Sequence, residues 1–154
     1  MRIKEVIIIV NQTRNNAANT LEHWFSQAPS LPINAKETLV KYMPIIALIF
    51  GIIGILLSLA GIAALTALAP AAIVTGVYGY SGGILAAIFW LASSILLFAA
   101  YSGTKARKMS GWNMLFWGEI VSLIGSLITL SIIQGIISAL ISFYLLYQIK
   151  PYYQ

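Results

Sequence analysis

The sequence IIALIFGIIGILLSLAGIAALTALA at residues 45–69 contains no charged residue and no proline, so it needs a nonpolar environment. As one helix it would be about 37 Å long at about 1.5 Å per residue, and the hydrocarbon core of a bilayer is about 30 Å thick. The uncharged stretch continues on both sides and covers residues 42–104. This length predicts two membrane-spanning helices and a connection between them.

The composition also favours a membrane protein, because 60% of the 154 residues are hydrophobic and only 8% are charged. Soluble domains carry charge on about 25% of their residues, so a soluble globular protein is excluded. The chain has no cysteine and no aspartate, and His23 is its only histidine. We therefore predict no disulfide, no metal site and no cofactor.

Loop-forming residues divide the uncharged stretch into a first span at residues 45–69 and a second span at residues 84–101. The residues that indicate this connection are Pro70, Gly76, Tyr78, Gly79, Tyr80, Gly82 and Gly83. The tyrosines among them are typical of the depth at which lipid headgroups lie.

The apolar residues 112–149 would form a helix about 57 Å long and must therefore fold back. We place the third and fourth spans at residues 112–130 and 135–149, joined by a turn at residues 131–135 that contains Gln134. The sequence thus predicts an all-α integral membrane protein with four transmembrane helices in two hairpins. Because the last span is short, a re-entrant second hairpin stays open as an alternative.

The basic residues indicate the orientation, since they occur in residues 1–44, in the loop after the second span and in the tail, residues 150–154. Positively charged segments remain preferentially in the cytoplasm. We expect a multi-pass protein of the cell (inner) membrane, with transmembrane residues 45–149 and both termini cytoplasmic. The excess of nine Lys and Arg over four acidic residues favours contact with lipid over nucleic acid. The loop residues expected to contact anionic headgroups are Lys105, Arg107 and Lys108.

Short amphipathic cytoplasmic helices are expected before the first span. The apolar residues of one recur with helical spacing: Leu21, Trp24, Phe25 and Ala28. A second helix is expected to begin at Asn34, where Glu37 completes a capping box, and to enter the first span with a kink at Pro44. This segment either docks a partner or forms a collar on the protein's own helices.

Small residues are expected to hold the spans together, because lipid does not drive large apolar side chains against one another. In the first span they recur on one face: Gly51, Gly54, Ser58 and Gly61. In the third span a similar stripe includes Gly118 and Gly125. These stripes predict close helix contacts, either within one chain or between chains.

Glu119 is the only charged residue in the predicted spans, which makes it the default functional candidate there. One hypothesis is that Glu119 faces a polar cavity lined by Ser122, Ser126 and either Ser93 or Ser94. The alternative is that it reaches the basic loop or a nearby hydroxyl and only positions the third span.

Two functional classes follow from these features. The first is a small integral membrane protein that acts as a structural subunit, assembly factor or interaction partner, in a homo-oligomer or with another membrane protein. The alternative is a small proton- or cation-coupled carrier that uses Glu119. We do not expect an enzyme and assign no catalytic residue, because no serine in the spans has a histidine or aspartate to activate it.

Overall fold

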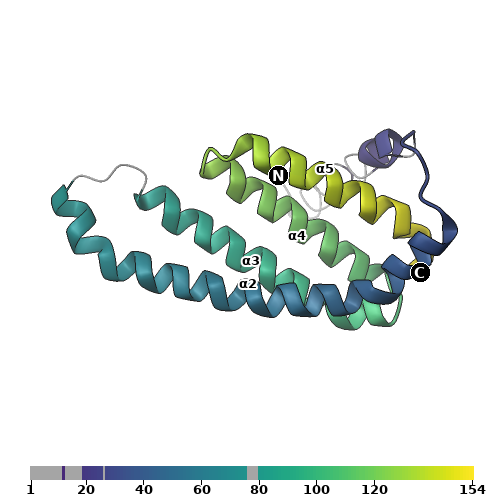
Figure 1. The fold of residues 1–154 in the computed structure, drawn as a ribbon, viewed down its shortest axis with the longest axis horizontal. Helices are drawn as coiled ribbons and strands as arrows, with labels where there is room; N and C mark the ends of the chain where they lie inside the picture. The colour runs from purple at the N-terminus through teal and green to yellow at the C-terminus, as the bar shows by residue number, and fades with distance from the viewer. Residues whose placement is uncertain (1–11, 13–18, 26, 76–79) are drawn as a thin grey trace, which may run out of the picture.

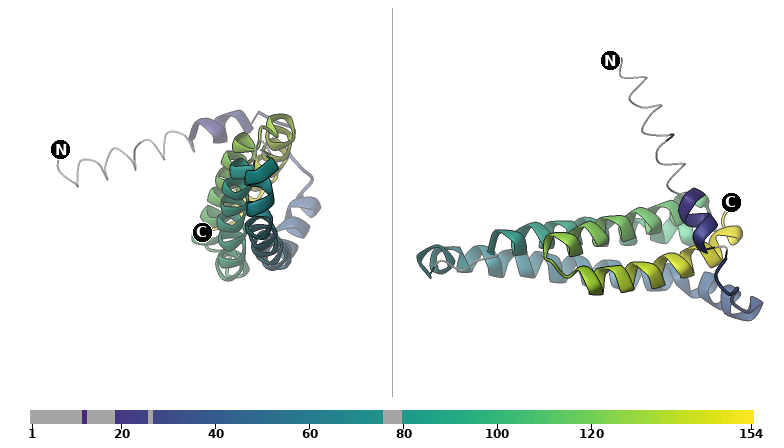
Figure 2. Two further views of the ribbon diagram at one scale, coloured as in Figure 1. Left: turned by 90° about the vertical axis from the view of Figure 1, so that its left-hand side faces the viewer. Right: turned by 90° about the horizontal axis from the view of Figure 1, so that it is seen from above.

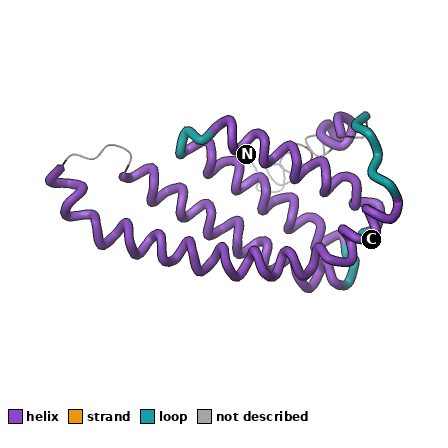
Figure 3. The backbone as a smooth tube through the Cα atoms, in the orientation of Figure 1, coloured by secondary structure: helices purple, strands orange, loops and turns teal. Residues whose placement is uncertain are grey.

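The computed structural model describes residues 12, 19–25, 27–75 and 80–154. Within these ranges the chain contains no strand, and the all-α fold is confirmed (Figures 1 and 3). A short helical segment at residues 19–25 comes first. It is followed by α2 (Ile33–Thr75), α3 (Tyr80–Lys105), α4 (Met109–Ile128), α5 (Ile132–Ile149) and the 3-10 helix η1 (Lys150–Tyr152).

The four long helices form an open trough. In Figure 1 they follow one another in chain order from α2 to α5, and in the view from above α5 overlaps α2 while α4 overlaps α3 (Figure 2, right). The helices α3 and α4 therefore form the base of the trough, and α2 and α5 form its edges. Helix α2 packs along α3 and α3 packs along α4, whereas α2 and α5 contact each other only sparsely.

The Lys and Arg residues that the structure describes gather at one end of the trough, which we call the basic end. There α2 and α4 begin, and α3 and α5 end (Figure 1). Backbone hydrogen bonds join the residue after η1 to the α3–α4 loop and to the start of α4, since Gln154 N–H donates to the Arg107 carbonyl (2.9 Å) and Met109 N–H donates to the Gln154 carbonyl (2.7 Å). The opposite end, with the α2–α3 and α4–α5 connections, is the distal end.

All four helices are long and apolar enough to cross a membrane. With 20 and 18 residues, α4 and α5 are about 30 and 27 Å long, close to the thickness of a bilayer core. With 43 residues, α2 is about 64 Å long. The α2–α3 hairpin therefore extends beyond the α4–α5 hairpin at the distal end (Figure 1).

Helix α2 is longer than the first span expected from the sequence. It runs without interruption through Pro44 and Pro70, although Pro70 was expected in a loop. A long membrane helix tolerates the loss of the single backbone hydrogen bond that a proline removes. At its start, the carbonyl of Pro32 accepts the N–H groups of Ala35 and Lys36, so Asn34 lies inside the helix and is not its N-cap.

The other boundaries shift by a few residues. Gly82 and Gly83 belong to α3, while Gly76, Tyr78 and Gly79 lie outside the described residues. Helix α4 begins at Met109 and α5 at Ile132, so the turn between them falls at residues 129–131 and not at 131–135.

The α4–α5 turn ends α4 in a Schellman motif. Ser131 N–H donates to the Ser126 carbonyl (3.0 Å), and Leu130 N–H donates to the Leu127 carbonyl (3.2 Å). Leu130 has a φ of 57°, the left-handed region that glycine normally occupies in this motif. Because Leu130 occupies the position where glycine is usual, no turn signature could be recognised here from the amino-acid sequence.

The expected small residues of the first span pack against α3. A Cβ atom on Gly51 would lie 2.7 Å from the backbone nitrogen of Phe98, and one on Gly54 would collide with the side chain of Ser94. Gly61 differs, because nothing lies within 4 Å of the position that its Cβ would take. The stripe is therefore packed from Gly51 to Ser58, which is 1% exposed, and is open only at Gly61.

The glycines of α4 face α3 from the other side. A Cβ on Gly118 would lie 3.0 Å from Leu97 Cδ1, and one on Gly125 would lie 3.1 Å from Phe89 Cβ. The hydroxyl of Ser93 also donates to the Gly118 carbonyl (2.8 Å). Helix α3 therefore packs between α2 and α4, and both of these helices contact it through small residues.

An aromatic cluster fastens α4 to α5 at the basic end. The rings of Trp112 and Phe116 stack at 5.4 Å, and Phe116 lies 5.3 Å from Phe143 of α5. The indole N–H of Trp112 donates to the Leu146 carbonyl (2.8 Å). Toward the distal end the two helices approach closely again at Gly135, where an added Cβ would lie 2.5 Å from Ser126 Cβ.

Residues 19–25 and 27–32, which we call the strap, pack across the basic end of α5. Phe25 of the strap stacks on Tyr147 at 5.5 Å, and Glu22 forms an ion pair with Lys150. The hydroxyl of Tyr144 donates to the Pro29 carbonyl (2.6 Å). The strap is therefore a collar on the protein's own helices, while Trp24 is 73% exposed.

Candidate functional site

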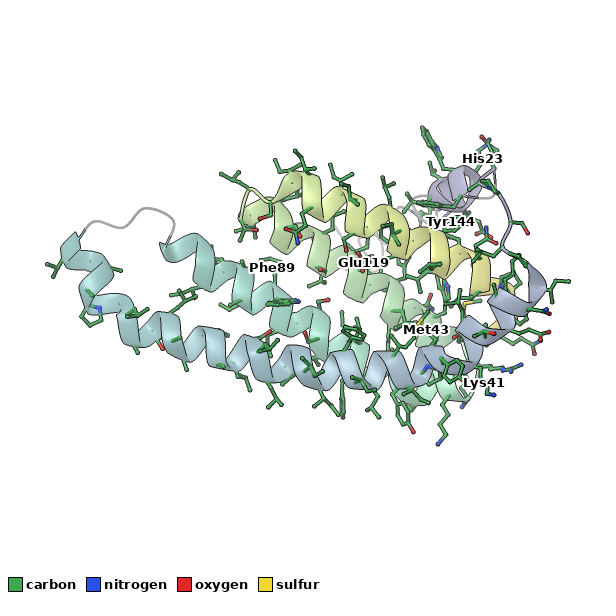
Figure 4. The ribbon with its side chains drawn as sticks, in the orientation of Figure 1. His23, Lys41, Met43, Phe89, Glu119 and Tyr144 are labelled. Atoms are coloured by element: carbon green, nitrogen blue, oxygen red, sulfur yellow. The ribbon has the colours of Figure 1, made fainter. Side chains whose placement is uncertain are left out.

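Glu119 lies in the middle of α4, about 15 Å from its first residue, Met109 (Figure 4). Its partly buried carboxylate lies near the hydroxyl of Ser142 in α5. Glu119 is not among the residues that line the cavity described next. The contact that the structure gives Glu119 therefore joins α4 to α5.

A cavity of about 520 Å³ lies in the distal half of the trough. All four long helices contribute to it, and Ser122 and Ser126, which the sequence proposed as cavity residues, are part of its lining. Ser93 and Ser94 are not, and the hydroxyl of Ser94 donates to the Trp90 carbonyl of its own helix. The lining contains no charged residue and consists of Leu57, Ser58, Gly61, Gly83, Ala86, Ala87, Trp90, Ser122, Gly125, Ser126, Thr129, Ser131, Gln134, Gly135 and Ser138.

Three hydroxyl groups of the lining donate to carbonyls of their own helices. Ser58 donates to the Gly54 carbonyl at 2.6 Å, Ser126 to the Ser122 carbonyl at 3.1 Å, and Thr129 to the Gly125 carbonyl at 3.2 Å. Each of these oxygens keeps lone pairs that can accept a further hydrogen bond. The cavity is therefore rich in acceptors.

The side of the cavity formed by the α4–α5 turn is open. Ser131, Gln134 and Ser138 are exposed there, and so is Trp90 of α3, at 53%. The amide of Gln134 supplies both a donor and an acceptor. A molecule in the cavity would meet these uncharged polar groups and the aromatic ring of Trp90.

A second surface feature lies on α2 and was missed by the sequence reasoning. Four exposed alanines occupy one side of its distal half at positions i, i+4, i+7 and i+11: Ala60, Ala64, Ala67 and Ala71. We call these residues the alanine face. On the same side of the basic-end half, the exposed residues are large, namely Ile49, Ile53 and Leu56.

A close glycine contact at the basic end was also missed. A Cβ on Gly103 of α3 would lie 2.6 Å from the Cα of Gly111 in α4. These two residues form a single pair and not a repeated stripe, so periodicity could not reveal them. The alanines of the alanine face recur with a helical period, as do the small residues that pack inside the protein. Only their exposure in the folded chain distinguishes the alanine face from those internal contact surfaces.

Lys105 at the end of α3 and Arg107 and Lys108 in the following loop are exposed, as required for the expected contact with lipid headgroups. Arg107, just after the end of α3, has a φ of 52°, and its carbonyl accepts a hydrogen bond from the backbone N–H of Gln154. Next to it, the hydroxyl of Tyr153 is buried and has no partner among the described residues. Burial raises the pKa of the Tyr153 phenol above its ordinary value of 10.0, and the charge of Arg107 offsets part of this effect.

Within the described ranges, no three His, Asp or Glu side chains gather into a group that could hold a metal ion. Comparisons with protein-family models, curated proteins and solved structures find no match to this chain.

Proposed function

We propose that this protein is a structural or assembly subunit of a membrane complex, and that a transmembrane helix of another membrane protein packs on its alanine face. The observation that carries the proposal is the change along one side of α2, from the exposed Ile49, Ile53 and Leu56 to four exposed alanines. Lipid tails solvate large apolar side chains well, whereas small residues allow a neighbouring helix to approach closely.

The length of α2 supports the same role. The alanine face lies in the part of α2 where the α2–α3 hairpin begins to extend past the α4–α5 hairpin (Figure 1). The protein's own α5 touches α2 only sparsely. A partner helix would therefore find this side of α2 accessible, at the outer interface of the bilayer and just beyond it.

A carrier based on Glu119 receives less support. The carboxylate of Glu119 lies near Ser142, between α4 and α5, and the cavity has no charged residue in its lining. A positioning role for Glu119 accounts for both observations.

A photocrosslinking amino acid placed on α2 tests the proposal in native membranes. At Ala64 it should give one protein adduct of defined mass, whereas at Ile53, on the same side of the helix, it should give only lipid adducts. A second substitution, Ala67→Trp, should reduce the Ala64 adduct at least tenfold because its bulk separates the two helices. Since Ala67 is exposed, the thermal stability of the purified protein should not change. An absent adduct, or one that is insensitive to Ala67→Trp, would contradict the proposal.

We also propose that the basic end faces the cytoplasm and that the membrane is the cell (inner) membrane. The exposed cationic loop supports this orientation. Because the chain lacks cysteine, single cysteines can be introduced at Ala106 and Gln134. An impermeant maleimide should label intact cells only at position 134, and label position 106 after permeabilisation. The opposite pattern would reverse the orientation, and no labelling at 134 from outside would favour a re-entrant second hairpin.

A further inference from the structure

We infer that the distal cavity is a binding site for the uncharged, hydroxyl-rich headgroup of a membrane lipid, such as a hexosyl diacylglycerol. This inference is independent of the proposed function, because it concerns the cavity between the four helices and not the alanine face.

The first argument is the chemistry of the lining. Seven of its residues carry hydroxyl or amide groups and none is charged: Ser58, Ser122, Ser126, Thr129, Ser131, Gln134 and Ser138. A phosphate or ammonium headgroup would enter without a counter-charge and would lose its hydration, which is unfavourable. A neutral polar headgroup has a smaller desolvation cost, which hydrogen bonds with the lining can offset.

The second argument is the direction of the hydrogen bonds. The hydroxyls of Ser126 and Thr129, which are not fully buried, already donate to carbonyls of their own helix, so they offer acceptors to a ligand. A ligand that satisfies them must donate. Sugar and glycerol hydroxyls donate several hydrogen bonds within one small volume, whereas an ester or ether oxygen cannot donate.

The third argument is the aromatic ring at the opening. Trp90 lines the cavity and is 53% exposed. The indole presents a flat apolar surface, against which the C–H face of a sugar ring can pack while its hydroxyls turn to the polar side. The cavity volume of about 520 Å³ is sufficient for a hexose with accompanying water.

The fourth argument is depth. If the basic loop lies at one interface, α4 of about 30 Å brings the turn at residues 129–131 to the opposite interface. The cavity is next to this turn, so its polar groups lie where lipid headgroups begin. The exposed Leu57 and Leu130 then provide apolar surface for acyl chains.

Native mass spectrometry of the full chain in nanodiscs tests the inference. The discs contain equal amounts of a hexosyl diacylglycerol, a diacylglycerol and a phosphatidylglycerol with identical acyl chains. The protein should retain the hexosyl lipid preferentially. Removing one hydrogen-bonding group with Thr129→Val or Gln134→Leu should weaken retention about three- to tenfold.

Thr66→Val is the matched control. Thr66 is exposed, lies outside the cavity and bonds to the carbonyls of its own helix in the same way as Thr129. Its substitution should leave retention unchanged. Equal retention of hexosyl lipid and phosphatidylglycerol, or retention that neither cavity variant weakens, would overturn the inference.

Two further arms identify the occupant. A methyl hexoside that displaces the lipid at equal concentration would show that the ligand is a free sugar, which would overturn the assignment to a lipid. A cysteine at Ser138 that forms a disulfide with a second copy in the membrane would assign the cavity to a protein contact and would overturn it as well.

Discussion

Substituting Gly51 by alanine should destabilise the protein, although alanine is the better helix former. The added Cβ would lie 2.7 Å from the backbone nitrogen and 2.8 Å from the Cα of Phe98 in α3. Ordinary contacts of this kind are at least 3.4 Å long, so α2 and α3 must separate locally by about 0.7 Å. A gap of this size forfeits a quarter to a half of the dispersion energy of the neighbouring contacts.

Overpacking of this kind typically costs about 1–3 kcal/mol, and the helix propensity of alanine returns up to about 1 kcal/mol. We therefore expect Gly51→Ala to lower the free energy of unfolding by about 1–2 kcal/mol. Gly61→Ala belongs to the same sequence stripe but meets nothing within 4 Å, so it should leave the stability unchanged or raise it by up to about 1 kcal/mol. A difference of about 2 kcal/mol between the two variants is about 30-fold in the unfolding equilibrium.

The assay is unfolding of the purified protein in mixed micelles, titrated with a denaturing detergent and followed by the circular dichroism of its helices. Gly82→Ala provides a second control on α3, because its added Cβ also meets nothing within 4 Å. If Gly51→Ala unfolds at the same detergent fraction as Gly61→Ala, then α2 and α3 do not approach as closely as described.

Three other substitutions test separate features. Leu130→Gly should stabilise the protein by about 0.5–1 kcal/mol, because glycine adopts a φ of 57° without strain; lower stability in the same titration would argue against the Schellman turn. Tyr153→Phe should be tolerated at pH 7, since the buried hydroxyl has no described partner. Because burial raises the pKa of Tyr153 above 10.0, its neutral form stabilises the fold fully below pH 10, and this contribution is lost as the pH rises through the raised value. The wild type should thus lose stability relative to Tyr153→Phe in titrations above pH 10, and parallel pH profiles would contradict this reasoning. Glu119→Gln should preserve both folding and the Ala64 crosslink, because a polar side chain of the same shape stays next to Ser142, whereas Glu119→Leu should weaken the α4–α5 contact by about 0.6 kcal/mol. Loss of the crosslink in Glu119→Gln would instead support a functional carboxylate.

The helical membrane fold could be predicted because it depends on where charge is absent. Residues 45–69 contain no charged residue, so they require the apolar environment of a membrane. Small residues such as Gly51 and Gly125 recur with a helical period, which predicts that they lie on contact faces. Pro70 was misplaced, because the local propensity of proline to end a helix is weaker than the need of a membrane helix to keep its remaining hydrogen bonds. The turn at Leu130 was misplaced because a leucine takes the conformation of a glycine.

The site was predictable only in part. Ser122 and Ser126 line the cavity, but their separation from Glu119 depends on how α4 is rotated against α5. The open surroundings of Gly61 depend on where the helices diverge. Neither rotation nor divergence is encoded in the period of a single helix.

The strap has a consequence for how the protein is made. Its residues leave the ribosome before those of any long helix, yet their partners are Tyr144, Tyr147 and Lys150 at the end of α5. The α2–α3 hairpin can pack as soon as both helices are inserted, but the strap has nothing to bind until the last helix arrives. Docking of the strap therefore requires that α5 has already been synthesised, and a product truncated before the end of α5 would leave Phe25 and Glu22 without these partners.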